Sequence, residues 1–309
     1  MSSGEGKAAK GLITDFGMLA DRAPKGMKVA VAGASDEVVL KAVRKAFDRG
    51  IVDGGLLAFT KEGSAEEAKA LGLSGFDMIT AGDDRSAADA AVEAVRNGRC
   101  GILMKGFVQT KDFMKAVLDK ATGLRRSGVL SQVGIYQIEG IDRLILMADV
   151  GICIAPDLAQ KAQIVAAAAA VARAFGNPCP KVAALSSVEV VNPSIPGSED
   201  ARELKGMAER GLLGKLVLDG PLALDNAVSP EAAAHKGISS EVAGDADILL
   251  APDLNSGNMM AKAAVYFARA KAAGVVTGAQ CPIVLTSRAD SDETKFNSIA
   301  AAAFLGTRG

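Results

Sequence analysis

The sequence is poor in the residues that metal centres and covalent catalysis use. It has one histidine, His235, in an alanine-rich stretch, and its four cysteines, Cys100, Cys153, Cys179 and Cys281, are far apart with no CxxC pair. Zinc clusters and Cys/His nucleophilic pairs require closely grouped residues of these two types. We therefore expect no metal site and no cysteine nucleophile.

Aromatic residues and charge imbalance are also scarce. Aromatics make up 4% of the chain with no tryptophan, and 35 basic against 36 acidic residues leave a net charge of −1. Aromatic side chains for base stacking and an excess of basic residues for phosphate binding are therefore missing, which argues against a nucleic-acid partner. No apolar run approaches the roughly 18 residues that span a bilayer, so we expect no membrane partner. The N-terminal residues 1–11 have no apolar core after their lysines, and we read them as a flexible tail of a cytoplasmic protein.

What the sequence does contain is a repeated alternation of short apolar runs with amphipathic stretches, from Lys28 to Thr122 and again after 155. A repeated succession of strand and helix predicts an α/β fold whose mostly parallel sheets are covered by helices on both faces. At 309 residues the chain exceeds the roughly 250 to 300 residues of a single core, which favours two domains with a site in the cleft between them.

The pattern changes between 133 and 155, where two apolar runs flank the polar turn at 139–142. This change predicts an antiparallel hairpin at a domain crossing. A late strand often completes a doubly wound sheet, so we assign 1–134 plus 276–309 to a discontinuous first domain. The second domain is then 135–275.

Three loops follow predicted strands, at the carboxyl ends where open α/β sheets bind ligands. The first, LVLDGPLALDNAVS at 216–229, contains a turn at Asp219, Gly220 and Pro221, with Asp225 and Asn226 following. The alternatives are a functional loop with two acidic groups or a turn with an Asx cap.

The second loop lies within ADILLAPDLNSGNMMAKA at 246–263, where a strand runs into a helix start. Free backbone N–H groups at such a start suit a phosphate or carbonyl oxygen. A simple helix cap needs only one polar residue, whereas several are present here. The candidate ligand-binding residues are Asp253, Asn255, Ser256, Gly257, Asn258 and, one turn on, Lys262.

The third loop is in PIVLTSRADSDETKFNSIAAAA at 282–303, where Thr286, Ser287 and Arg288 leave a strand before a helix. The guanidinium fork of arginine matches phosphate, and a helix start adds partial positive charge. We predict an oxyanion site at this loop. The alternative is a surface arginine beside a capping box formed by Asp290 and Glu293.

These three strings, in this order and spacing, resemble the phosphate acetyltransferase and phosphate butyryltransferase family. LMKGFVQTKDFMKAVLD at 103–119 and VLSQVGIYQIEG at 129–140 are similar to the butyryl branch. The resemblance covers the chain from about Thr14 to Gly306.

The resemblance implies two three-layer α/β/α domains akin to isocitrate dehydrogenase, usually as a homodimer formed by the second domain. It implies reversible transfer of a short acyl group between coenzyme A and inorganic phosphate, giving acyl phosphate in an interdomain cleft. The mechanism would use a ternary complex without an acyl-enzyme. Coenzyme A is then a substrate, and no cofactor is expected.

The resemblance also assigns roles to residues. Arg288 matches the phosphate-binding arginine, and Ser287 matches the serine that stabilises the oxyanion. The aspartate seven residues after that serine, the proposed base in the acetyl branch, is replaced here by Thr294. Asp290 (unless it only caps the helix), Asp292 or Asp225 would have to take over the proton.

A second departure is at Tyr266, which stands where the acetyl branch has an additional arginine. Lys105, Lys115 and Lys262 are candidates to supply that charge. Two other functions stay open: a non-catalytic regulatory protein that binds acyl-CoA, and an NAD-dependent decarboxylating dehydrogenase of the same fold class. The second is disfavoured because GASDEVV after the first strand lacks GxGxxG.

Overall fold

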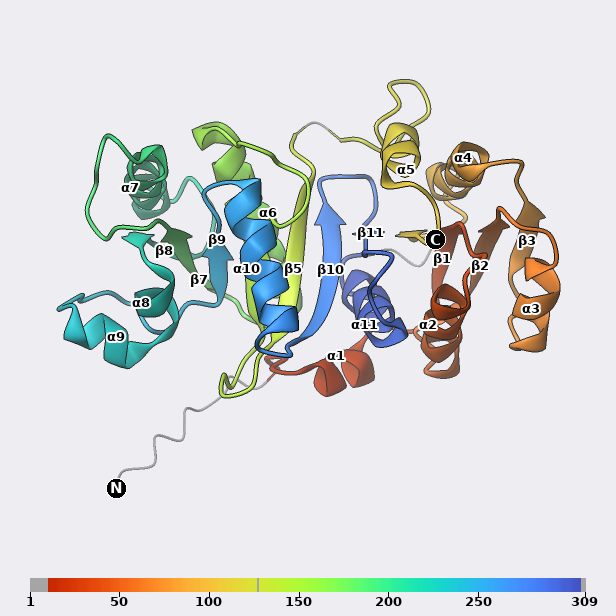
Figure 1. Ribbon diagram of the computed structural model, residues 1–309, viewed down its shortest axis with the longest axis horizontal. Coiled ribbons are helices and arrows are strands. Elements are labelled where there is room, and N and C mark those ends of the chain that lie inside the picture. The colour runs from red at the N-terminus through yellow and green to blue at the C-terminus, as the bar shows by residue number, and fades with distance from the viewer. Residues whose placement is uncertain (1–10, 127, 307–309) are drawn as a thin grey trace.

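The computed structural model describes residues 11–126 and 128–306, so the predicted N-terminal tail lies outside it except for Gly11. Its strands form one twisted sheet that crosses the whole molecule (Figure 1), in the order β3-β2-β1-β4-β11-β10-β5-β6-β9-β7-β8. The strands are β1 (Met27–Ala32), β2 (Val52–Phe59), β3 (Asp77–Thr80), β4 (Ile102–Lys105), β5 (Ser131–Gln137), β6 (Ile145–Ala148), β7 (Lys181–Leu185), β8 (Val217–Leu222), β9 (Ile248–Leu250), β10 (Lys271–Thr277) and β11 (Ile283–Val284).

The strands at the centre of the sheet are antiparallel, and those on either side are parallel. β10 pairs antiparallel with both β11 and β5, and β5 pairs antiparallel with β6, which confirms the predicted hairpin. β4 pairs in parallel with β1 and β11, and β9 with β6 and β7. The predicted α/β class with mostly parallel strands is confirmed, and the sheets expected for two domains are joined into one through β5 and β10.

The predicted domain boundaries, 134/135 and 275/276, both fall inside this central pair of strands. Gly134 of β5 lies directly opposite Gly274 of β10. The last strand, β11, lies beside β4 in the half of the sheet built from the N-terminal part of the chain. The two-domain division remains a prediction, and the central pair is where its two halves meet.

Helices cover both faces of the sheet (Figure 1). They are α1 (Phe16–Arg22), α2 (Glu37–Asp48), α3 (Ser64–Ala70), α4 (Asp84–Arg96), α5 (Thr110–Val117), α6 (Leu158–Ala174), α7 (Pro196–Glu209), α8 (Leu224–Val228), α9 (Pro230–His235), α10 (Leu254–Tyr266) and α11 (Asp292–Ala303). None of those in the described residues is long and apolar enough to cross a membrane.

The buried core differs between the two faces of the sheet. On one face a single hydrophobic cluster runs under α1, α2, α11, α6 and α7. On the other face the core splits into two clusters, one under α4 and α5 and the other under α10 and α8. Between these two clusters the central strands β5 and β10 are not covered by a helix core, which leaves room for a site.

Candidate active site

A cavity of about 330 Å³ lies over the centre of the sheet, where the core is divided. Its floor comes from β5 and β10, and one wall is a face of α10 made by residues at helical spacing: Asn258, Ala261, Lys262 and Val265. The opposite wall is the segment after β11, with Thr286, Ser287, Asp290 and Thr294. The predicted third loop and part of the second loop therefore meet in one cavity.

The wall after β11 is a tight turn. The backbone N–H of Ser287 donates to Oδ2 of Asp290 at 2.7 Å, and the N–H of Ala289 donates to Oγ of Ser287 at 3.3 Å. The capping box of Asp290 and Glu293, the alternative to the predicted oxyanion site, is not formed, because Ser291 caps α11 by accepting from the N–H of Thr294 at 3.1 Å. Asp290 therefore lies before the helix, and its carboxylate holds the turn while it faces the cavity.

Thr286 lines the same cavity with an unused hydroxyl group. The residue is 9% exposed, and its Oγ1 is buried without a hydrogen-bond partner among the described residues. A buried hydroxyl without a partner costs free energy unless a ligand satisfies it. Its place between β11 and Ser287 makes this hydroxyl a ready donor for an oxygen of a bound substrate.

Positive charge gathers behind the turn. Lys105 at the end of β4 is 2% exposed, and Lys295 in α11 is 3% exposed. The ammonium of Lys295 donates to the carbonyl oxygens of Ser287 at 3.1 Å and of Asp290 at 2.6 Å. The guanidinium carbon of Arg288 lies 4.9 Å from the ring centroid of Phe107, and the side chain is open to solvent.

Two of these cations act on the third. Burial first, and then the positive charges of Arg288 and Lys295, lower the pKa of Lys105 to about 8 against the opposing pull of Asp84 and Asp290. Burial also lowers the pKa of Lys295 from its ordinary value. Repulsion of a buried lysine by two neighbouring cations indicates a site arranged for an anion.

The second predicted loop is divided between structural and cavity positions. Asp253 caps α10, accepting from the N–H of Ser256 at 2.9 Å, and both residues border a separate hollow. Asn255 is exposed. Gly257 packs so closely on the backbone that a Cβ would overlap the carbonyl oxygen of Asp149. Asn258 and Lys262 line the central cavity.

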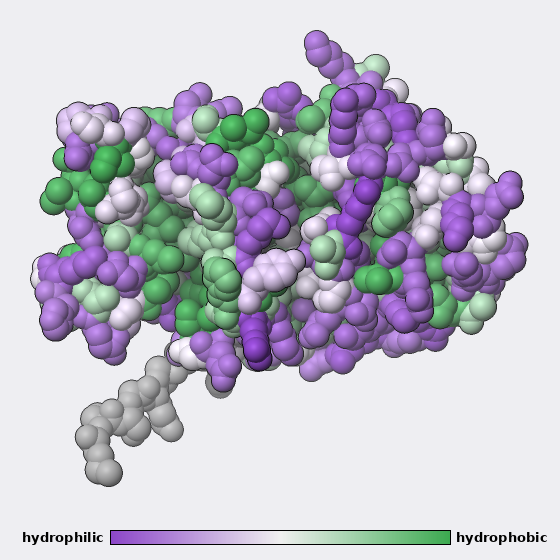
Figure 2. Space-filling view, in the orientation of Figure 1, coloured by the Kyte–Doolittle hydropathy of each residue, from purple (hydrophilic) through white to green (hydrophobic). Residues whose placement is uncertain are grey.

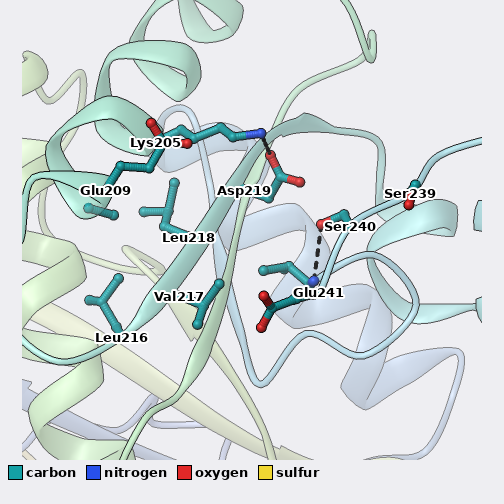
Figure 3. A pocket seen from close by; sticks show the side chains of 11 residues that line it. Lys205, Glu209, Leu216, Val217, Leu218, Asp219, Ser239, Ser240 and Glu241 are labelled. Carbon is teal, nitrogen blue, oxygen red and sulfur yellow. Dashed lines mark hydrogen bonds and ion pairs between the residues drawn. The ribbon is translucent and has the colours of Figure 1, made fainter.

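The first predicted loop lies elsewhere. Asp219 borders a hollow at the edge strand β8 (Figure 3), where its carboxylate pairs with Lys205 at 2.7 Å. Asp225 lies on α8, and its carboxylate is 2.9 Å from the ammonium of Lys236. Neither residue lines the central cavity. Lys115 is also outside the lining: it lies on the exposed side of α5, 3.7 Å from Asp112.

Several residues of the site were not predicted. Lys295 lies in α11, for which the sequence pattern indicated only an N-terminal cap. A lysine one turn inside an otherwise apolar helix face could nevertheless have indicated a buried charge at the site. Tyr136 and Gln132 line the floor from β5. Asp149 is buried and accepts backbone N–H groups of Gln132, Gly151 and Ile152 at 2.6 to 2.9 Å, which fixes the loop after β6.

Known proteins of one family are similar to this chain. Residues 84–303 match the phosphate acetyl/butaryl transferase family. The phosphate butyryltransferase of Clostridium acetobutylicum is 44% identical over 279 residues, covering 90% of this chain and 93% of the relative. The phosphate acetyltransferase of Thermotoga maritima is 41% identical over 279 residues, covering 90% and 95%.

A solved structure is similar over the same span. The branched-chain phosphotransacylase from Enterococcus faecalis superposes with a TM-score of 0.81 at 33% identity, covering 91% of this chain and 100% of the other. These likenesses support the acyltransferase hypothesis and not the regulatory or dehydrogenase alternatives. The chain therefore belongs to the phosphate acetyl/butaryl transferase family, and it is a phosphate acyltransferase.

Proposed function

We propose that the protein transfers a short acyl group between coenzyme A and inorganic phosphate, reversibly, with acyl phosphate and free coenzyme A as products. The observation that carries this proposal is the cavity wall after β11. There the unpartnered hydroxyl of Thr286 and the turn from Ser287 to Asp290 line the cavity, and two buried lysines lie behind that turn, outside the lining. The relatives are a phosphate butyryltransferase and a phosphate acetyltransferase, names that supply the acyl group and the phosphate of this proposal.

Phosphate would bind at the positive charges. Arg288 offers a planar fork that matches phosphate oxygens, and its position over Phe107 limits the directions in which the fork can point. Lys105 and Lys295 add charge from beneath the turn. A phosphate dianion would offset the burial and the repulsion from Arg288 and Lys295 that lower the pKa of Lys105, so phosphate binding would favour the charged form of this lysine.

The chemical step would join the two substrates directly. A phosphate oxygen attacks the thioester carbonyl carbon, a C–O bond forms, and the carbonyl oxygen takes negative charge. The C–S bond then breaks, and the coenzyme A thiolate leaves and takes up a proton. The hydroxyls of Ser287 and Thr286 are the donors suited to the oxyanion, and holding both substrates together supplies most of the gain over solution.

Asp290 is the best candidate for the group that exchanges this proton. One carboxylate oxygen is engaged by the N–H of Ser287, and the residue lines the cavity. Asp225 is paired with Lys236 outside the cavity, and Asp292 lies in the first turn of α11. In the reverse direction the Asp290 carboxylate would accept the thiol proton as a general base.

The remaining expectations join this proposal. The enzyme would need no resident cofactor, act in the cytoplasm and form a homodimer through its second half. In Figure 2, hydrophobic side chains gather over the half that carries α7 to α10. Large exposed apolar residues there include Val190, Leu224, Met259, Tyr266 and Phe267. Exposed patches of this kind mark interaction surfaces, which favours that half as the dimer contact.

The test is phosphate-dependent release of thiol from acetyl-CoA and butyryl-CoA. We expect release with at least one of them, and Arg288→Ala should raise the KM for phosphate at least about tenfold, the loss of a charge-assisted hydrogen bond. Arg202→Ala is the matched control, because Arg202 pairs with its neighbour Glu203 on α7. Absence of phosphate-dependent release with both acyl-CoAs would refute the proposed function.

A further inference from the structure

The cavity has an apolar end that the chemical step does not use. Strands β5 and β10 present one face to it, and their register places Tyr136 opposite Ala272 and Gly134 opposite Gly274. Paired glycines leave the backbone bare, so the floor is low at this point. The end is completed by Ala261 and Val265 of α10.

Tyr136 closes this end of the cavity. The side chain is 5% exposed, and it lies back along its own strand over Gly134, where a Cβ would overlap its hydroxyl and ring. The phenol is therefore directed towards Gln132, whose amide nitrogen donates to the carbonyl of Leu285 at 3.0 Å. Burial and the nearby Asp290 charge raise the pKa of Tyr136, so it remains a neutral phenol.

The two ends of the cavity differ in chemistry. Thr286, Ser287, Asp290 and Asn258 make one side of the lining polar, whereas the strand floor and the α10 residues Ala261 and Val265 carry no charge, with Lys262 between those two residues as the charged exception. A nucleotide with its phosphates is large and charged, and a cavity of about 330 Å³ is at the lower limit for a small-molecule site. Only the acyl chain of the substrate is both small and free of hydrogen-bonding groups.

We infer that the apolar end is the acyl-chain subsite and that Tyr136 sets the longest chain it accepts, which makes Tyr136 a specificity-determining residue for short saturated acyl groups. This inference rests on the proposed function. Gly134 is part of the same device, because its missing side chain is what lets the phenol lie flat on the strand. Removing the phenol would join the space above Gly134 to the cavity.

The experiment compares kcat/KM for acetyl-, butyryl-, hexanoyl- and octanoyl-CoA with phosphate. In Tyr136→Ala the hexanoyl to butyryl ratio should rise at least about tenfold, the scale of one or two methylenes in an apolar pocket. Tyr136→Phe removes only the hydroxyl and should keep the wild-type order. Leu118→Ala is the control, because Leu118 is 41% exposed and does not line the cavity, so its loss should leave the ratio unchanged.

A second variant acts in the opposite direction. Gly134→Ala would displace the phenol into the cavity and should lower the butyryl to acetyl ratio about tenfold. This variant decides the matter if Tyr136→Ala does not fold. Wild-type chain-length order in both variants, or in Gly134→Ala alone where only it folds, would overturn the inference while leaving the function intact. A wild type inactive with every acyl-CoA would overturn both.

Discussion

The buried charge of Lys105 should destabilise the folded protein. The residue is 2% exposed, and its ammonium donates a hydrogen bond to the carbonyl of Gly106 at 3.3 Å. Burial, then the charges of Arg288 and Lys295, lower its pKa to about 8. Replacing this residue by methionine keeps most of the volume and removes the buried charge. We therefore expect Lys105→Met to be more stable than the wild type at pH 7 in phosphate-free buffer.

The magnitude follows from the pKa of Lys105 in the two states. The pKa is about 8 in the folded protein against 10.5 for an ordinary lysine. At ~1.36 kcal/mol per pH unit, this difference corresponds to about 3 kcal/mol at pH 7. Between pH 8 and 10.5 the unfolded chain binds more protons at this group than the folded one, so wild-type stability gains with rising pH. The advantage of the variant is thus full below pH 8 and lost by about pH 10.5.

The assay is urea unfolding of both proteins at pH 7, 8, 9 and 10. Groups that titrate alike in both cancel in the difference, and exposed Lys61 replaced by methionine gives the baseline. Phosphate at saturation should stabilise the wild type more than Lys105→Met, because a ligand stabilises in proportion to its affinity for the fold. A variant less stable than wild type at pH 7, or a difference that does not change with pH, would refute the reasoning.

Three further outcomes are expected. Asp290→Asn should lower kcat by about 100-fold or more while the KM values change little, because the amide oxygen can still accept the N–H of Ser287 but cannot take a proton. Stopped-flow or steady-state thiol release measures this effect, and full activity would remove Asp290 as the base. Gly257→Ala should lower the free energy of unfolding by about 1 to 3 kcal/mol through overlap with the carbonyl of Asp149, whereas an unchanged urea midpoint would contradict the packing. Phosphate should raise the Tm of the wild type but much less that of Arg288→Ala, and equal shifts would place the anion elsewhere.

The sequence predicted those features whose partners are near in the chain. The turn from Thr286 to Asp290 follows a short strand and precedes a helix, and its internal hydrogen bonds span three residues or fewer. The hairpin of β5 and β6 is likewise local. Such features depend on residues a few positions apart, and that spacing can be read directly from the sequence.

The features of the site that spacing did not reveal depend on distant partners. Asp225 has the acidic loop context expected of a base, but Lys236 engages its carboxylate, which spacing alone did not reveal. Tyr136 became a cavity wall only because β10 pairs with β5 in a register that sets Gly274 opposite Gly134. Polar residues at the start of α10 looked equivalent, although Asp253 and Ser256 satisfy the helix cap between them.

The sheet order explains why one site can hold two unlike substrates. β4 and β11 are adjacent and parallel, with Val284 opposite Met104, so their carboxyl ends deliver Lys105 and Thr286 to the same edge. The apolar end is instead built on β5 and β10, with α10 above it. β10 pairs with both β5 and β11. The strand that forms part of the proposed acyl-chain subsite is therefore hydrogen-bonded to the strand that leads into the turn from Thr286 to Asp290. The reacting carbonyl would therefore lie where the two meet, between Ser287 and the bare glycine pair.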